Sequence, residues 1–260
     1  MKPRALAGIF LALLLQPTSV LAQFIGGSSF NGTDSLVATW SGKGSAASIG
    51  FAALGMNPPT LQNLGGVVQL ILGSSYACRW ATADYRWKVI PNTVAEADGL
   101  CQVLFYRTFQ KGEHPPYRFL WFVSVPYDIR TYVISNVSGV DVASSNNGHG
   151  TMLSANGVTT TEVDDYLMAF YANLGSGTWT KPSNMGIAVE NDYAYIGPTT
   201  LNFRNLATQA WAYPAAGTGN KVATMSGNPA DWVADLVAFK PLYRIRPRQA
   251  VRKGSTRLHE

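Results

Sequence analysis

The sequence predicts an all-β protein: an antiparallel sandwich of two sheets with a jelly-roll-like topology. Its composition, 47% apolar and 13% charged, is that of a chain with a packed core and excludes a disordered one. Short runs rich in β-branched and aromatic residues alternate with turn residues throughout the chain. No segment has a helical apolar period over more than about ten residues.

The N-terminus has the pattern of a secretory signal, which we assign to residues 1–23. Lys2 and Arg4 precede an apolar run, Ala5–Leu15, that is well short of the ~20 residues needed to span a bilayer. No cysteine follows the expected cleavage site, so a lipid anchor is not expected, and no later segment has the pattern of a transmembrane segment. We therefore expect a secreted or extracellular protein.

The mature chain is expected to form a single sandwich domain over 24–241. The alternation is clearest in Cys101–Phe109, where Cys101, Val103 and Phe105 point to one face and Gln102 points to the other. The other predicted strands are Ser35–Trp40, Val67–Leu72, Tyr85–Ile90, Tyr117–Val125, Arg130–Ser135, Tyr166–Ala172, Tyr193–Ile196, Leu206–Tyr213 and Trp232–Phe239.

Two segments share one order of features. Both Val67–Trp87 and Asp165–Met185 run from an apolar strand through a polar loop to an aromatic stretch. The likeness has two possible explanations: a repeat of supersecondary units, or the similarity that strands and turns of any all-β sequence share.

The two cysteines, Cys78 and Cys101, favour one disulfide, because their number is even and the chain is expected to be exported. Two buried free thiols are the alternative. Metal binding is not expected, because neither cysteine has a second Cys or His at ligand spacing.

The net charge of +5 belongs largely to the C-terminus. Seven of the 20 basic residues lie between Lys240 and Arg257, and the only acid beyond Lys240 is Glu260. We expect 242–260 to be a disordered basic tail, either simply solvated or in contact with an anionic surface. Residues 24–239 are mildly acidic, so nucleic acid is not an expected partner.

Several stretches resemble a group of poorly characterised β-sandwich domains of exported bacterial proteins and phage-associated surface or tail proteins. They are Val158–Ala172, Thr178–Pro182 and Trp232–Pro241, together with 101–107, 117–122 and 132–141. The likeness covers roughly residues 60–241. It implies a jelly-roll-like sandwich with a surface or binding role and no assigned chemistry. Asp235 departs from the small apolar residue typical of such domains in the last strand, which puts the burial of that face in question.

No catalytic residue or cofactor is predicted. The Gly-x-Ser-x-Gly elbow and the phosphate-binding glycine motifs are absent from the sequence. His149 lies in Ser144–Gly150, which we expect to be a flexible polar loop. As a general base it would need an orienting carboxylate and a nucleophile, neither of which can be located from the sequence.

Acidic residues keep two alternatives open. A polysaccharide-cleaving enzyme would use paired carboxylates, for which Glu113, Glu162, Glu190 and Asp192 are candidates by residue type. A calcium site would use Asp141 with Asp164–Asp165, although turn capping is the favoured role for these acids.

Aromatic residues near turns support a binding function. Exposed Trp rings can stack on the apolar faces of sugars, and we take Trp80, Trp87 and Trp179 as candidates, with Asn147 and His149 as polar partners. The sequence therefore favours a secreted non-catalytic module that binds a glycan or cell-surface polymer. The alternatives are the carboxylate-based enzyme and a structural component of an extracellular or phage-like assembly.

Overall fold

The computed structural model describes residues 23–32, 45–49, 64–83, 86–109, 117–123, 125–175, 177–194, 202–212 and 217–242. Almost all of them lie in antiparallel strands or the connections between them, so the predicted all-β sandwich is confirmed. The expected signal except for its last residue, Gln23, most of the basic tail and the expected strand Ser35–Trp40 lie outside the described residues. The described residues contain no helix long and apolar enough to cross a membrane.

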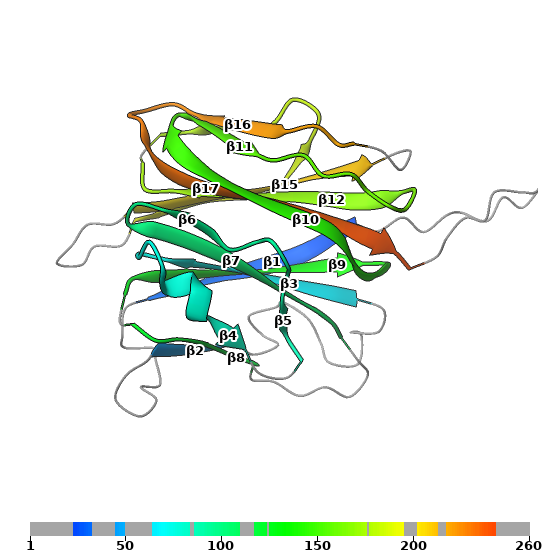
Figure 1. The fold of residues 1–260 in the computed structure, drawn as a ribbon, viewed down its shortest axis with the longest axis horizontal. Coiled ribbons are helices and arrows are strands. Elements are labelled where there is room, and N and C mark those ends of the chain that lie inside the picture. Colours follow the sequence, from blue (N-terminus) through cyan, green and yellow to red (C-terminus); the bar gives the residue numbers. More distant parts are fainter. Residues whose placement is uncertain are drawn as a thin grey trace, which may run out of the picture.

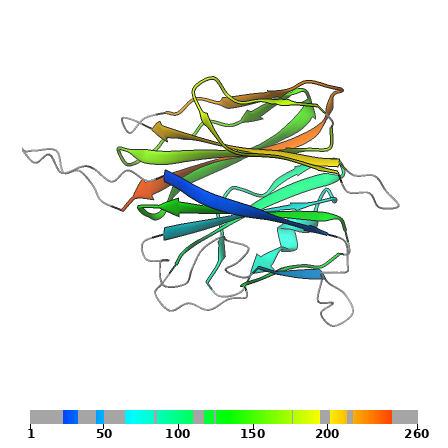
Figure 2. The same ribbon diagram turned by 180° about the vertical axis from the view of Figure 1, so that it is seen from behind.

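Two large sheets form the middle of the molecule, and each is covered by a smaller sheet (Figures 1 and 2). The first large sheet has the order β1 (Gln23–Gly32), β9 (Tyr127–Ser135), β3 (Leu64–Leu72), β7 (Leu100–Thr108) and β5 (Lys88–Val89), with β6 (Ala95–Ala97) also paired to β7. The second has the order β10 (Val137–Gly150), β17 (Ala230–Pro241), β12 (Asp165–Asn173), β15 (Asn202–Ala212) and β14 (Gly186–Ala194).

Each small sheet has three strands. The one beside the first large sheet contains β2 (Ser45–Ile49), β8 (Tyr117–Trp121) and β4 (Thr82–Ala83). The one beside the second contains β11 (Met152–Ala155), β16 (Lys221–Met225) and β13 (Trp179–Thr180). The only helical element described is a short 3-10 turn, η3 (Ala77–Trp80).

The two halves of the chain have the same topology. When β6 is set aside, eight strands are described in each half, and, numbered within that half, they pair as 1-8-3-6-5 in the large sheet and 2-7-4 in the small one. In a jelly roll, the first, eighth, third and sixth strands are neighbours in one sheet, and the second, seventh and fourth are neighbours in the other. Each half has this strand order. The segments with the same order of features begin at topologically equivalent strands, β3 and β12, so their likeness reflects a repeated unit.

Three apolar layers fill the spaces between the four sheets. Val68, Val103 and Ile129 face the small sheet of the first half, where they pack around Phe119 and Trp121. Leu167, Ala169 and Tyr171 pack similarly against the small sheet of the second half. The middle layer joins the halves and includes Val67, Leu104, Tyr132, Tyr166, Phe170 and Phe239.

The central position of β12 explains its sequence. All its residues are buried, and its alternate side chains contribute to two different apolar layers. In a strand that is covered on both faces, polar and apolar residues do not alternate, so its sequence is a continuous apolar run. In β7 the predicted alternation is confirmed: Cys101, Val103 and Phe105 face the outer layer, while Leu104 faces the middle one.

The segment 144–150 corrects the prediction of a flexible loop. It is the second half of β10, and its residues pair from Ser144 with Leu236 to Gly150 with Ala230. The strand was not recognised in the sequence because its small polar side chains lack the apolar alternation typical of strands. Two of them bond to the chain beyond the hairpin: Ser144 Oγ donates to Asn156 O (2.6 Å) and Asn146 Nδ2 to Ser154 O (2.8 Å).

The other predicted strands fall on strands at least in part, with shifted ends. Tyr117–Val125 forms a strand only to Trp121, and Tyr193 is near the end of β14. Ile196 and Tyr213 lie outside the described residues. The sequence did not predict β11 and β16, which are short and alternate between buried and more exposed residues.

A chain of buried hydrogen bonds crosses the middle layer. Tyr132 Oη donates to Gln69 Oε1, Gln69 Nε2 to Gln102 Oε1, and Gln102 Nε2 to Asp235 Oδ2, each at 2.6 Å. Asp235 is fully buried, and this burial raises the pKa of its carboxyl well above the usual value. The residue that departs from the expected apolar pattern thus links the last strand to the first half.

We expect Gln102→Leu to lower the free energy of unfolding by about 1–3 kcal/mol, because it leaves Gln69 Nε2 without its acceptor and Asp235 without its donor. Asp235→Asn keeps an acceptor for Gln102 and should cost clearly less. Urea denaturation of both variants measures the difference. A Gln102→Leu protein as stable as Asp235→Asn would contradict a stabilising role for this chain of bonds.

Candidate functional site

Among the described residues, the two halves differ near their contact. The segment between β3 and β4, residues 73–81, is longer than its counterpart between β12 and β13, residues 174–178, and it contains η3. The segment between β5 and β7 contains the strand β6, and its counterpart between β14 and β15 lies outside the described residues. Because the strands follow one plan, these connections are where a specific function is most readily added to the common fold.

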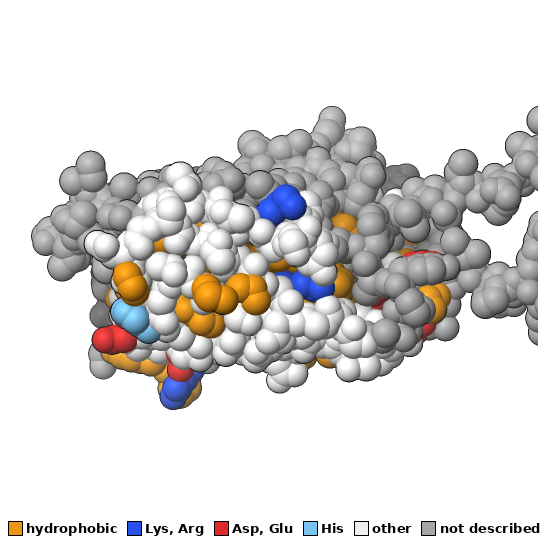
Figure 3. Space-filling view, turned by 90° about the horizontal axis from the view of Figure 1, so that it is seen from above, with side chains coloured by type: hydrophobic (Ala, Val, Ile, Leu, Met, Phe, Trp, Pro, Cys, Tyr) orange, Lys and Arg blue, Asp and Glu red, His pale blue; other side chains and the backbone are white. Residues whose placement is uncertain are grey.

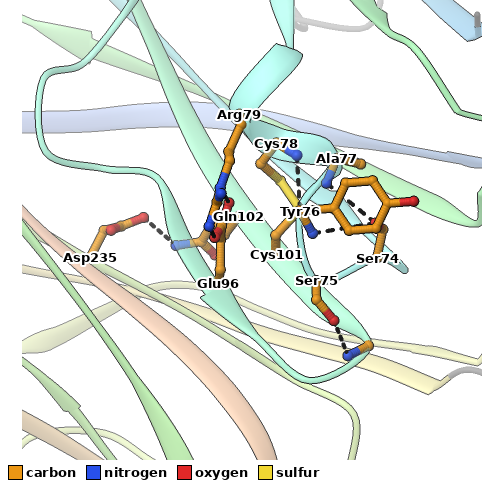
Figure 4. The surroundings of a disulfide bond; sticks show 11 residues. Ser74, Ser75, Tyr76, Ala77, Cys78, Arg79, Glu96, Cys101, Gln102 and Asp235 are labelled. Atoms are coloured by element: carbon orange, nitrogen blue, oxygen red, sulfur yellow. Dashed lines mark hydrogen bonds and ion pairs between the residues drawn. A yellow bond between two sulfur atoms is a disulfide. The ribbon is translucent and has the colours of Figure 1, made fainter.

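The predicted disulfide between Cys78 and Cys101 is present and fixes η3 to β7. Both residues are buried, and the Cys78 backbone N–H points at Cys101 Sγ (3.1 Å). Ser74 Oγ accepts from the backbone of Ala77 (3.3 Å), and Ser75 Oγ accepts from Gly99 N (2.8 Å), as Figure 4 shows for the turn around η3. The turn is therefore attached to the sheet at several points.

An ion pair joins η3 to β6. Arg79 Nε donates to Glu96 Oε1 (2.6 Å) and Arg79 Nη2 donates to Glu96 Oε2 (2.5 Å). Figure 4 shows the two side chains extended toward each other. The planar guanidinium and the carboxylate form a two-bond fork that fixes the orientation of both groups.

The second half contributes polar residues from the end of β10. Asn147 Nδ2 donates to the backbone oxygen of Glu96, so this contact bridges the halves. His149, two residues further and hence on the same face of the strand, lies 3.0 Å from Asp231 Oδ1 through Nδ1. The His149 side chain is 65% exposed.

Two exposed aromatic side chains lie on the same turn as Arg79. Trp80 is 60% exposed at the end of η3, and Tyr76 is 55% exposed just before it. We call Tyr76, Arg79, Trp80, Glu96, Asn147, His149 and Asp231 the seam patch, because they come from both halves where β6 approaches β10.

Trp87 and Trp179 do not belong to this surface, which corrects their expected role as sugar platforms. Trp87 packs edge-on against Phe109 and Phe119 in the outer core of the first half. Trp179 is buried beside Tyr171 in the equivalent layer of the second half. Gly66 makes room for Trp87, since a Cβ there would lie 2.9 Å from the indole ring. Turn residues in the sequence did not distinguish these buried rings from Trp80.

His149 has one of the two partners that a general base requires. Asp231 supplies an orienting carboxylate, which the sequence could not locate. Among the described residues no hydroxyl or thiol is hydrogen-bonded to the other ring nitrogen. The arrangement therefore presents a polar, exposed side chain whose orientation is set by Asp231.

A separate carboxylate pair lies at the opposite end of β10. Asp141 stands at a bulge in that strand, where its carboxylate accepts hydrogen bonds from Thr161 N (2.6 Å) and Thr161 Oγ1 (2.5 Å). Lys240 Nζ lies 3.2 Å from Asp141 Oδ1. Asp165, which is fully buried, lies close enough to Asp141 for the negative charge of Asp141 to act on its carboxyl.

This environment separates the two pKa values. Burial, together with the hydrogen bond and negative charge of Asp141, raises the pKa of Asp165 to about 8. The hydrogen bonds from Thr161 and the contacts with Asp165 and Lys240 outweigh desolvation and lower the pKa of Asp141 to about 2. Asp165 therefore carries the proton of the pair at neutral pH.

The pair does not have the geometry of a glycosidase. Such enzymes hold two carboxyl groups about 5–9.5 Å apart and open to the sugar between them, whereas the side chains of Asp141 and Asp165 are both buried. Glu113 and the side chains of Glu190 and Asp192 lie outside the described part of the molecule, and Glu162 is only half-buried. Within that part no group of three or more His, Cys, Asp or Glu side chains could hold a metal ion.

Comparisons of the chain with protein-family models, with curated proteins and with solved structures found no match.

Replacing both cysteines with alanine should lower the free energy of unfolding by about 2–4 kcal/mol, because the disulfide restricts the unfolded chain. Hydrogen exchange should accelerate first in 73–81 and 95–99, with the central strands unaffected under native conditions. Equal acceleration in β12 would show that the disulfide does not act locally. Alkylation of the unreduced wild-type protein, read by mass spectrometry, should modify neither cysteine.

The acid pair gives a pH-dependent stability. Folded Asp165 retains a proton that the unfolded chain releases above its ordinary pKa of 3.8, so stability falls as pH rises toward the folded value of about 8. The lowered pKa of Asp141 has the opposite effect on stability: its stabilising contribution is present at neutral pH and is lost only as pH falls toward about 2.

We expect the melting temperature of the wild type to decrease between about pH 5 and pH 9, and Asp165→Asn to make this decrease smaller, since its amide donates to Asp141 at any pH while buried Asp235 keeps its own contribution. Thermal unfolding of both proteins across this range is the measurement. Parallel curves for the two proteins would contradict the assignment of the proton to Asp165.

Proposed function

We propose that the protein is a secreted, non-catalytic surface module that binds a glycan or cell-surface polymer through the seam patch. The observation that supports this best is the exposure of Trp80 and Tyr76 on a turn that a disulfide and a two-bond ion pair hold in place. Sugar rings have apolar faces that pack on exposed aromatic rings, and a fixed turn loses little conformational entropy on binding.

The polar members of the patch suit the other requirement of a sugar ligand. Arg79, Asn147 and His149 offer hydrogen-bonding groups whose orientations are set by contacts within the patch. Hydroxyl groups both donate and accept, so they can use such mixed groups around an aromatic platform. Export is part of the proposal because residues 1–23 have a secretory pattern, and a role at a bacterial or phage surface follows from the resemblance of 60–241 to such domains.

Neither nucleic acid nor an enzymatic role has comparable support. The one arginine of the patch is engaged with Glu96, and the face over β11 and β16 presents mostly uncharged side chains among the described residues (Figure 3). A nucleic-acid surface needs clustered, available cations. The side chains of the acid pair Asp141 and Asp165 are buried, as described above.

The mature protein should retain at least one polysaccharide in a glycan array or in affinity gel electrophoresis, and Trp80→Ala should weaken this binding by about tenfold or more. Val163→Ala is the control, because Val163 is also exposed (42%) but lies just before β12, at the end of the second large sheet opposite Asp231. Undiminished binding by Trp80→Ala, or binding to no polysaccharide, would contradict the proposal. Release of reducing ends from the retained polymer would instead identify an enzyme.

A further inference from the structure

The charged groups of the seam patch are matched within the patch itself. Arg79 uses two of its nitrogens on the two oxygens of Glu96, at 2.6 and 2.5 Å. This is the geometry in which a guanidinium binds an external carboxylate or sulfate. Glu96 therefore occupies the position that an anionic ligand would need.

The pair of His149 and Asp231 likewise leaves no positive charge available for an anionic ligand. His149 Nδ1 and Asp231 Oδ1 are 3.0 Å apart. With His149 protonated, the four charged groups of the patch sum to zero. With His149 neutral, Asp231 leaves the patch with one negative charge. In neither state does the patch attract an anion.

The groups left available suit hydroxyls. The remaining guanidinium nitrogen of Arg79 and Nε2 of His149 are not engaged in the two pairs, and Asn147 Oδ1 is not used in its bond to Glu96. A guanidinium already paired with a carboxylate still donates to neutral oxygens. The exposed rings of Trp80 and Tyr76 lie on the same turn as Arg79.

We infer that the ligand of the seam patch is an uncharged polysaccharide, and that Glu96 determines this specificity by neutralising Arg79. The inference rests on the proposed function, since it names the class of glycan bound at the same surface. Glu96 is a specificity residue here: it rejects acidic polymers by occupying the cation that would bind them.

The test compares each neutral polymer that the wild type retains (β-glucan, mannan or xylan) with the carboxymethylated form of the same polymer. The wild type should bind the neutral form at least about tenfold more tightly, and its binding should change little with salt, because no ion pair with the ligand is formed. Glu96→Gln exposes the charge of Arg79 and should gain binding to the carboxymethylated form at low salt, a gain that high salt removes.

Asp164→Asn is the matched control, since it removes the same charge from a turn at the opposite end of the second large sheet, where Asp164 has a φ of 62° that asparagine adopts readily. It should leave the preference unchanged. Equal or tighter wild-type binding to the carboxymethylated form, or a Glu96→Gln protein that behaves like Asp164→Asn, would overturn the inference while leaving glycan binding intact. Retention of neither form would instead contradict the proposed function.

Discussion

The packing of the two large sheets against each other is the constraint on which the structure depends. Tyr132 from the first half lies across from Phe170 of the second with ring centroids 5.2 Å apart, and Tyr106 lies 5.7 Å from Phe239. Each large sheet also needs a cover on its outer face, which the small sheets provide. A half on its own would leave the aromatic middle layer in water, so the two halves stabilise each other.

Apolar packing does not by itself fix the position of one sheet over the other, because apolar contacts are not directional. The buried bonds from Tyr132 through Gln69 and Gln102 to Asp235 are directional and connect both sheets. A shift of one sheet would leave these groups unpaired in the core, which is costly. The buried bonds therefore also keep the seam patch together, because Asn147 and Glu96 come from different halves and meet only when the sheets are correctly placed.

Much of the fold could be predicted from local patterns. Strands such as β7 and β12 have apolar sequences because packing on one or both faces requires them, and the cysteine pair follows from the number of cysteines and the expected compartment. Strand β10 could not be predicted in this way. Its small polar residues have no preference of their own for a strand, and its conformation comes from pairing with β17, which is distant in the sequence.

The same distinction applies to the candidate site. Trp80, Asn147 and His149 could be selected as polar or aromatic residues near turns, but Glu96 and Asp231 acquire their roles only through contacts that folding creates. The acid pair of Asp141 and Asp165 likewise depends on a bulge that no local pattern marks. Burial also decided the role of the tryptophans, since Trp87 and Trp80 have similar polar neighbours in sequence and opposite exposures in the fold.

The difference between the equivalent halves is the strongest guide to function. The strand plan repeats, so the parts common to both halves are explained by folding alone. Folding alone does not explain the connection 73–81, because its counterpart spans the equivalent pair of strands with fewer residues. It is stabilised by a disulfide, by hydrogen bonds from backbone N–H groups to two serine hydroxyls and by an ion pair, yet it leaves its largest apolar ring in solvent, where that ring adds little to stability. A turn ordered in this way around an exposed ring is suited to contact with another molecule.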